Sequence, residues 1–197
     1  MKAKKIFLLA LMLVMVFTFS ACGGSSEPAA EGGSESGAPT VETAYPEGTF
    51  ILMNGTEVRI GTNMADLEGK IGEELKPSET IQPCDPNLDK PTVEYYFQGV
   101  NITTNEEGII ANIMLDERDG ETDSSFGGTV KLGDSIDGVK AILGEPEEGN
   151  EDEMFITYYF GPEEDQDMVM VYKDEDGNNT MTGIILSKGS LTMVPQN

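Results

Sequence analysis

Apolar and polar residues alternate over six short stretches between residues 93 and 186, a pattern typical of strands that bury one face. Each stretch is bounded by turn-forming residues, such as Glu107-Gly108 and Asp176-Gly177. The six predicted strands are 93–98, 100–104, 109–115, 154–160, 168–173 and 181–186. They form two successive groups of three, and short turns within a group predict an antiparallel meander.

A hairpin is predicted upstream of the first meander, from residues 49–53 and 56–60. Asn54-Gly55 connects its two strands, and this dipeptide accepts positive φ at both positions of a tight turn. Apolar spacing of i, i+3 and i+7 then predicts a short helix over 64–71 and a second over 136–143.

A tandem duplication would explain why the same pattern occurs twice. A shift of 72 residues superimposes glycines and apolar positions of the two halves, and a shift of 63 superimposes Tyr95-Tyr96-Phe97 on Tyr158-Tyr159-Phe160. We therefore predict an α+β fold of two repeats, 47–121 and 122–197, each a short helix packed on an antiparallel β-meander. The alternative is a chance coincidence of short matches.

The order of elements also resembles a known architecture. A short helix ending in Gly72-Glu73 or Gly144-Glu145-Pro146 precedes a tyrosine-rich strand and a meander, and the unit is duplicated. This arrangement is similar to the β-lactamase inhibitor protein fold and to small outer-membrane assembly lipoproteins of the BamE type, over about residues 49–190. The resemblance implies that the open sheet face and its loops bind other proteins. It transfers no individual binding residue.

Residues 1–21 are predicted to be a signal peptide. A basic start precedes an apolar run over 6–19, which as a helix spans about 21 Å and is too short for a membrane core of about 30 Å. Phe19-Ser20-Ala21-Cys22 resembles the lipobox of bacterial lipoproteins, although Phe19 departs from the usual Leu. The resemblance implies cleavage before Cys22 and attachment of diacylglycerol, with fatty acids such as palmitate, to its sulfur. An ordinary secretory signal is the alternative.

A disordered acidic tether is predicted over 22–46. Its Gly, Ser, Glu, Ala, Pro and Thr residues bury too little apolar surface to fold, and such a coil reaches on the order of 27 Å. The predicted location is therefore extracytoplasmic, with the folded part held at the bacterial cell membrane through Cys22. The sequence leaves open whether this is an inner or an outer membrane.

The composition excludes several classes of function. The 197 residues carry 36 acidic against 12 basic side chains, for a net charge of −24, which excludes a nucleic-acid partner. Since the chain contains no His, nucleophile pairs and metal sites that depend on imidazole are also excluded. Carboxylate pairs that could serve a glycosidase are unavoidable at this acidity. We predict no enzymatic activity and no cofactor.

Four aromatic residues are the predicted partner-binding site. Strand periodicity places Tyr96, Phe155, Tyr159 and Tyr172 on the open side of the meanders, opposite the predicted helices. Rigid amphipathic rings of this kind are enriched in protein-binding surfaces. The alternative is that the two repeats pack against each other there.

The remaining candidates have simpler explanations. Cys84 lies in a proline-rich segment and is either a buried thiol or an exposed one that could cross-link chains. Residues 174–179 resemble a calcium loop, but Tyr172 stands where an acid would be needed. The sequence therefore predicts a non-catalytic module that binds an extracytoplasmic protein, to inhibit it or to hold it in an assembly. The alternative is a lipoprotein that binds a small ligand or a cation such as calcium.

Overall fold

The computed structural model describes residues 43–82, 90–118, 120–176 and 179–189. The leader, Cys22, most of the predicted tether and Cys84 lie outside the described residues. The elements within them are β1 (Ile51–Met53), β2 (Thr56–Val58), η1 (Met64–Leu67), β3 (Lys76–Ile81), β4 (Thr92–Phe97), β5 (Val100–Thr104), β6 (Ile110–Asp116), β7 (Ser125–Phe126), α1 (Ile136–Leu143), β8 (Phe155–Phe160), η2 (Glu163–Asp165), β9 (Asp167–Lys173) and β10 (Met181–Ser187).

Seven antiparallel strands form one large sheet in the order β3-β4-β5-β6-β10-β9-β8. The meander β4-β5-β6 therefore joins the meander β10-β9-β8 edge to edge, through the pairing of β6 with β10. Met114 lies opposite Ile185 at this junction. A large continuous sheet thus spans both halves of the chain, with β3 and β8 as its edge strands.

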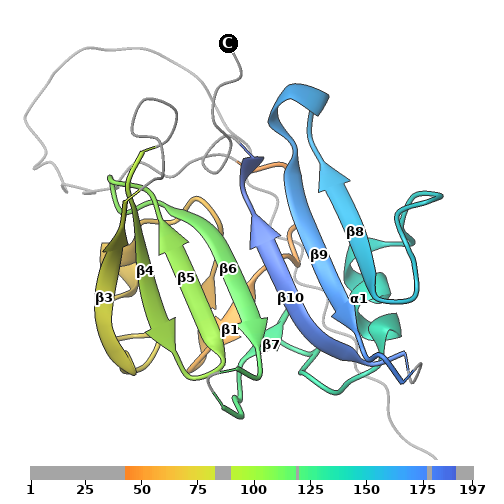
Figure 1. Cartoon of the computed structure of the whole chain (residues 1–197), viewed down its shortest axis with the longest axis horizontal. Coiled ribbons are helices and arrows are strands. Elements are labelled where there is room, and N and C mark those ends of the chain that lie inside the picture. Colours follow the sequence, from red (N-terminus) through yellow and green to blue (C-terminus); the bar gives the residue numbers. More distant parts are fainter. Residues whose placement is uncertain (1–42, 83–89, 119, 177–178, 190–197) are drawn as a thin grey trace, which may run out of the picture. The chain divides into compact units, whose positions relative to one another are not determined.

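One face of the large sheet is covered. The small sheet β2-β1-β7 and helix α1 lie against it, as Figure 1 shows, and their apolar residues meet those of the large sheet in a single core. Ile51, Phe126 and Ile136 from the covering layer are fully buried, as are Ile102 and Ile184 from the large sheet. No element of the described chain covers the opposite face, which we call the open face.

The predicted fold class is wrong: the described chain is mostly β, with two antiparallel sheets and a single α-helix rather than two helix-on-meander repeats. The first predicted helix is only the 3-10 turn Met64–Leu67. Glu68 leaves the helical conformation at ψ 129°, and Gly69 has φ 72°. Met64, Leu67 and Ile71 are nevertheless buried. The apolar spacing thus identified the buried positions correctly, but the backbone there is a short 3-10 turn followed by a loop rather than an α-helix.

The second predicted helix is confirmed as α1. The Ser135 hydroxyl caps its start by accepting from the Asp137 N–H at 3.2 Å, and Gly144 ends it with φ 88°. The hairpin of β1 and β2 is also confirmed, with Asn54 and Gly55 both at positive φ. The tandem duplication itself stays a prediction.

The six predicted strands of the meanders are confirmed within a residue or two of their bounds. Strand β3 lies in the segment between the first helical turn and the first meander, where the sequence analysis placed no strand. Pro77 is accommodated because β3 is an edge strand whose register shifts between Lys76 and Glu79.

Tyr45 joins the start of the described chain to the sheet. Its hydroxyl lies 2.6 Å from the carbonyl oxygen of Ser187 and 2.9 Å from that of Met168, and its ring contacts Phe160 edge-on at 5.7 Å. The Ala44 N–H donates to the Asp167 carboxylate at 2.7 Å. Residues that the sequence assigned to the end of the tether are therefore part of the fold.

Within the described ranges, no helix has both the length and the apolar character needed to cross a membrane.

Candidate functional site

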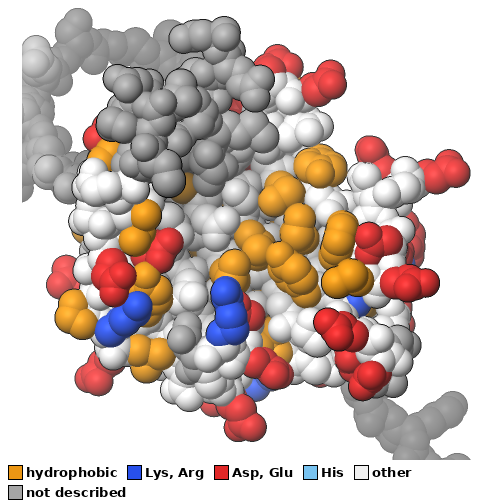
Figure 2. All heavy atoms as spheres, in the orientation of Figure 1, with side chains coloured by type: hydrophobic (Ala, Val, Ile, Leu, Met, Phe, Trp, Pro, Cys, Tyr) orange, Lys and Arg blue, Asp and Glu red, His pale blue; other side chains and the backbone are white. Residues whose placement is uncertain are grey.

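An exposed apolar cluster lies on the open face over β8, β9 and β10, where Figure 2 shows hydrophobic side chains gathered together. Phe155 is 36% exposed, Tyr172 40% and Tyr159 48%. Three half-buried methionines and a half-buried isoleucine lie on the same face, on β6, β10 and β9. We call this set the aromatic–methionine patch: Met114, Phe155, Tyr159, Met168, Met170, Tyr172 and Ile185.

Strand register explains why these residues lie together. Phe155 is directly opposite Tyr172, and Tyr159 is opposite Met168, across the β8–β9 ladder. Since side chains alternate between the two faces of a strand, residues two apart share the open face. Their neighbours Ile156, Val169 and Val171 point into the core and are fully buried. The sequence prediction that Phe155, Tyr159 and Tyr172 point away from the core is therefore confirmed.

Tyr96 lies apart from the other three rings, although it stands in the same cross-strand row as Met114 of the patch, two strands away. It shares the open face but belongs to β4, separated from β9 by β5, β6 and β10, which corresponds to about 19 Å at roughly 4.8 Å per strand. Its hydroxyl donates to the Glu94 carboxylate at 2.5 Å, and the Lys76 ammonium lies 3.6 Å from its ring centroid. The structure thus groups three of the four predicted residues on neighbouring strands. The fourth, Tyr96, already contacts Glu94 through its hydroxyl and Lys76 through its ring.

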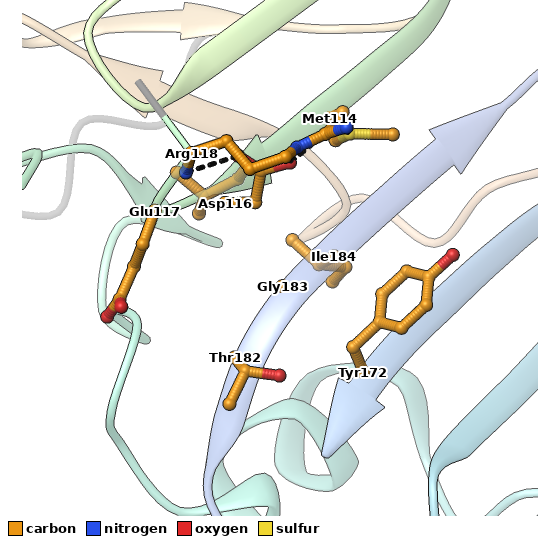
Figure 3. Close-up of a pocket in the computed structure, with 9 residues that line it drawn as sticks. Met114, Asp116, Glu117, Arg118, Tyr172, Thr182, Gly183 and Ile184 are labelled. Carbon is orange, nitrogen blue, oxygen red and sulfur yellow. Dashed lines mark hydrogen bonds and ion pairs between the residues drawn. The ribbon is translucent and has the colours of Figure 1, made fainter. Parts of the chain in front are cut away.

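The open face is hollowed at Gly183. This residue stands between Asp116 of β6 and Tyr172 of β9 in the same cross-strand row, so the row lacks a side chain at its centre. A pocket of about 590 Å³ results, bordered by Met114, Tyr172 and the segment 116–118 (Figure 3). A Cβ added at Gly183 would lie 3.4 Å or more from its neighbours, which is ordinary van der Waals contact. The backbone there could therefore carry a small side chain, which would partly fill the hollow.

The pocket's one arginine is held by neighbouring groups. The Arg118 guanidinium lies 2.5 Å from the Asp116 carboxylate and also contacts the sulfur of Met114. The guanidinium therefore lies beside Met114 at the edge of the patch and forms an ion pair with Asp116 (Figure 3).

A turn at the start of β8 fixes the exposed end of the patch. The Asp152 carboxylate accepts from the N–H groups of Met154 at 2.7 Å and Phe155 at 2.9 Å. The hydrogen bond from the Phe155 N–H, and next that from the Met154 N–H, lower the pKa of Asp152 below its ordinary value. Met154, 57% exposed, is thereby presented beside Phe155.

The remaining sequence candidates are a calcium loop and two cysteines. Within residues 43–82, 90–118, 120–176 and 179–189, no three His, Cys, Asp or Glu side chains are placed to hold a metal ion. The suggested calcium loop is only partly described. Its Asp174 carboxylate accepts the Asp176 N–H at 3.0 Å, as in an ordinary turn. Cys84 and the lipidation residue Cys22 fall outside the described residues.

Sequence reasoning missed Met114, Met168 and Ile185 as members of the patch. Ile184 and Ile185 are both apolar, so strand alternation alone does not say which one is exposed. The pairing of β6 with β10, which brings Met114 beside Ile185, has no local signal in the sequence. The glycine at 183 within a strand was the available clue to a hollow surface.

Comparison with known proteins yields no match to a family model, to a curated protein or to a solved structure.

Proposed function

We propose that this protein is a lipid-anchored extracytoplasmic lipoprotein whose folded region binds another protein, without catalysis, through the aromatic–methionine patch. The observation that carries the proposal is the clustering of three exposed rings on an open sheet face. Covering such an apolar patch with a partner removes its surface from water, which is favourable. Aromatic residues and methionine are also the side chains most enriched in protein interfaces.

The rigidity of the scaffold supports a binding role. Each patch residue is carried by a strand paired on both sides or, for Phe155 and Tyr159, by β8 paired with β9. Buried residues beneath, such as Val169 and Val171, hold those strands in place. A surface ordered before binding loses little conformational entropy when a partner docks.

The proposed anchoring rests on the sequence of residues 1–22. The lipobox resemblance supports acylation of Cys22, and two acyl chains hold a protein stably at a bilayer. Ala44 hydrogen-bonds to Asp167 of the fold, and 21 residues separate it from Cys22. A chain of this length lets the patch meet partners clear of the lipid surface.

Site-specific photo-cross-linking in the native cells tests the proposed function. Benzoylphenylalanine replaces Tyr159 in the full chain, and Leu75 in a control. Leu75 is 55% exposed but precedes β3 at the opposite edge of the large sheet. We expect a discrete protein adduct from position 159 that is absent from position 75, because only the first lies in the patch.

The same experiment includes Phe155→Ala and Tyr172→Ala in the chain labelled at position 159. Each removes one member of a directly opposed pair, and we expect the adduct to fall about fivefold, as for central interface residues worth about 1 kcal/mol. Circular dichroism checks that the fold persists. Equal adducts from both positions, or adducts indifferent to both alanines in a folded chain, would rule out the patch as a binding surface.

A further inference from the structure

Tyr172 stands between two hollows at one end of the aromatic–methionine patch. On one side is the pocket above Gly183. On the other is a second pocket of about 390 Å³, lined by Met154 and by the turn after β9, including Asp174, Glu175 and Asp176. Tyr172 and Thr182 border both pockets, so the tyrosine ring forms the ridge between them.

The two hollows have an acidic border. Five carboxylates line them, Asp116 and Glu117 on one side and the segment 174–176 on the other, against two cations, Arg118 and Lys173. Both cations are already paired. Arg118 lies 2.5 Å from Asp116, and Lys173 donates to Glu151 at 3.2 Å. The border is therefore negative towards any approaching molecule.

Three of the border carboxylates have no cationic partner in the described part of the chain: Glu117, Glu175 and Asp176. All three are exposed. They stand on two different loops, one after β6 and one after β9, with the ring of Tyr172 between them. An apolar ridge flanked by unpaired acids complements a side chain with an apolar stem and a positive end.

The protein itself contains such an arrangement on the same sheet face. The Lys76 ammonium lies 3.6 Å from the ring centroid of Tyr96 and 3.2 Å from the Glu79 carboxylate. A cation over a tyrosine ring is attracted by the ring face, and a neighbouring carboxylate strengthens the contact. Among the described residues, no lysine or arginine takes the corresponding place over Tyr172.

We infer that the aromatic–methionine patch docks a basic polypeptide segment, whose apolar residues cover the patch and whose lysine or arginine lies against Tyr172 between Glu117 and the 175–176 turn. This inference rests on the proposed function and names the chemistry of the partner. Charge complementarity carries it, because the patch centre is apolar while Glu117, Glu175 and Asp176 at its border have no cationic partner among the described residues.

Charge also argues against two other occupants. A second copy of this chain would bring its own acidic border to the same surface, and the whole chain has a net charge of −24. An anionic lipid surface would be repelled for the same reason. The negative charge that disfavours a second copy and an anionic lipid surface attracts a basic segment.

The test uses the full chain labelled with benzoylphenylalanine at position 159, in the native cells. One variant combines Glu117→Gln, Glu175→Gln and Asp176→Asn, which removes the three unpaired border charges. The matched control combines Glu68→Gln, Glu73→Gln and Glu74→Gln, three exposed acids between η1 and β3. We expect the protein adduct to fall about fivefold in the first variant and to stay unchanged in the control.

Mass spectrometry of the adduct identifies the captured segment, and we expect lysine or arginine beside apolar residues there. If Tyr172→Ala lowers the adduct but the border variant does not, the basic-partner inference is wrong and the proposed function stands. An adduct with a second copy or with lipid also overturns the inference. If neither the patch variants nor the border variant changes the adduct, the proposed function fails as well.

Discussion

The half-buried hydroxyl of Tyr45 ties the residues before β1 to two strands of the large sheet. The Tyr45 oxygen has the carbonyl groups of Met168 and Ser187 as acceptors and receives the Ser187 N–H at 2.9 Å. These are backbone groups of β9 and β10, so the bonds hold the chain entry against the strands that carry the patch. Removing one partner of a buried hydrogen bond costs more than the bond itself contributes.

We expect Tyr45→Phe to lower the free energy of unfolding by about 1–2 kcal/mol, because the hydrogen bonds from the hydroxyl to β9 and β10 are lost while the ring is kept. Urea titration followed by circular dichroism measures this change. The control is Tyr159→Phe, whose hydroxyl is exposed and outside this network. Equal stability of the two variants would contradict a structural role for the Tyr45 hydroxyl.

Tyr45 also makes the stability of the fold depend on pH in the alkaline range. Burial, helped by the Asp167 charge, raises the pKa of Tyr45 well above 10, and burial raises the pKa of Tyr158 to about 12. Above pH 10 the unfolded chain therefore loses protons that the folded chain keeps, so stability falls as pH rises from 10 to 12. We expect this fall to be shallower in Tyr45→Phe, measured by urea titrations at pH 9, 10 and 11.

At the scale of elements, the loop between α1 and β8 protects one edge of the large sheet. Asn150 accepts the Thr157 N–H at 2.8 Å, and Asp152 donates its N–H to the Phe155 carbonyl at 3.1 Å, along the outer side of β8. Glu151 adds an ionic link from this loop to α1 through Lys140, at 3.0 Å, and to β9 through Lys173. Edge strands covered in this way do not pair with other chains.

We expect Glu151→Gln to lower stability by about 1 kcal/mol, since both lysines lose a half-buried partner. Hydrogen bonds from Lys140 and then Lys173 hold the pKa of Glu151 below 4.5. Its contribution is therefore complete above pH 4.5 and is lost as pH falls through the lower, folded value. Thermal unfolding at pH 7 and pH 3 measures the difference from wild type, which should be smaller at pH 3.

Glu148→Gln serves as the control for Glu151→Gln, because Glu148 is exposed in the same loop and makes no ion pair with a described residue. A loss of stability at pH 7 no larger than that of the control would show that the ionic link contributes nothing.

At the scale of the whole molecule, the proposed anchor and the acidic fold act in opposite directions. The proposed cleavage before Cys22 would remove three of the 12 basic residues and none of the 36 acidic ones. Anionic lipid would therefore repel the folded region, and the proposed acyl chains on Cys22 are what would hold it at the membrane. The proposed patch then stays available to partners rather than to lipid.

We expect Cys22→Ala to leave the chain uncleaved and without lipid, because the acylated sulfur is the group that signal peptidase II requires in lipobox proteins. Metabolic labelling with a fatty acid and the mass of the chain in the membrane fraction measure both. The control is Cys84→Ala, which should remain labelled and cleaved. A Cys22→Ala chain that still carries lipid would end the anchoring proposal.

The sequence by itself determined where the strands of the two meanders lie and which side chains face the core. Ile156 and Val171 are buried while Phe155 and Tyr172 are exposed, because alternation is a local property of each strand. The tertiary structure decided how far the helical turn at Met64 extends, that β3 forms despite Pro77, and that β6 pairs with β10. These outcomes depend on contacts between residues far apart in the chain. The assembly of the aromatic–methionine patch and its hollow at Gly183 depend on the same long-range pairing.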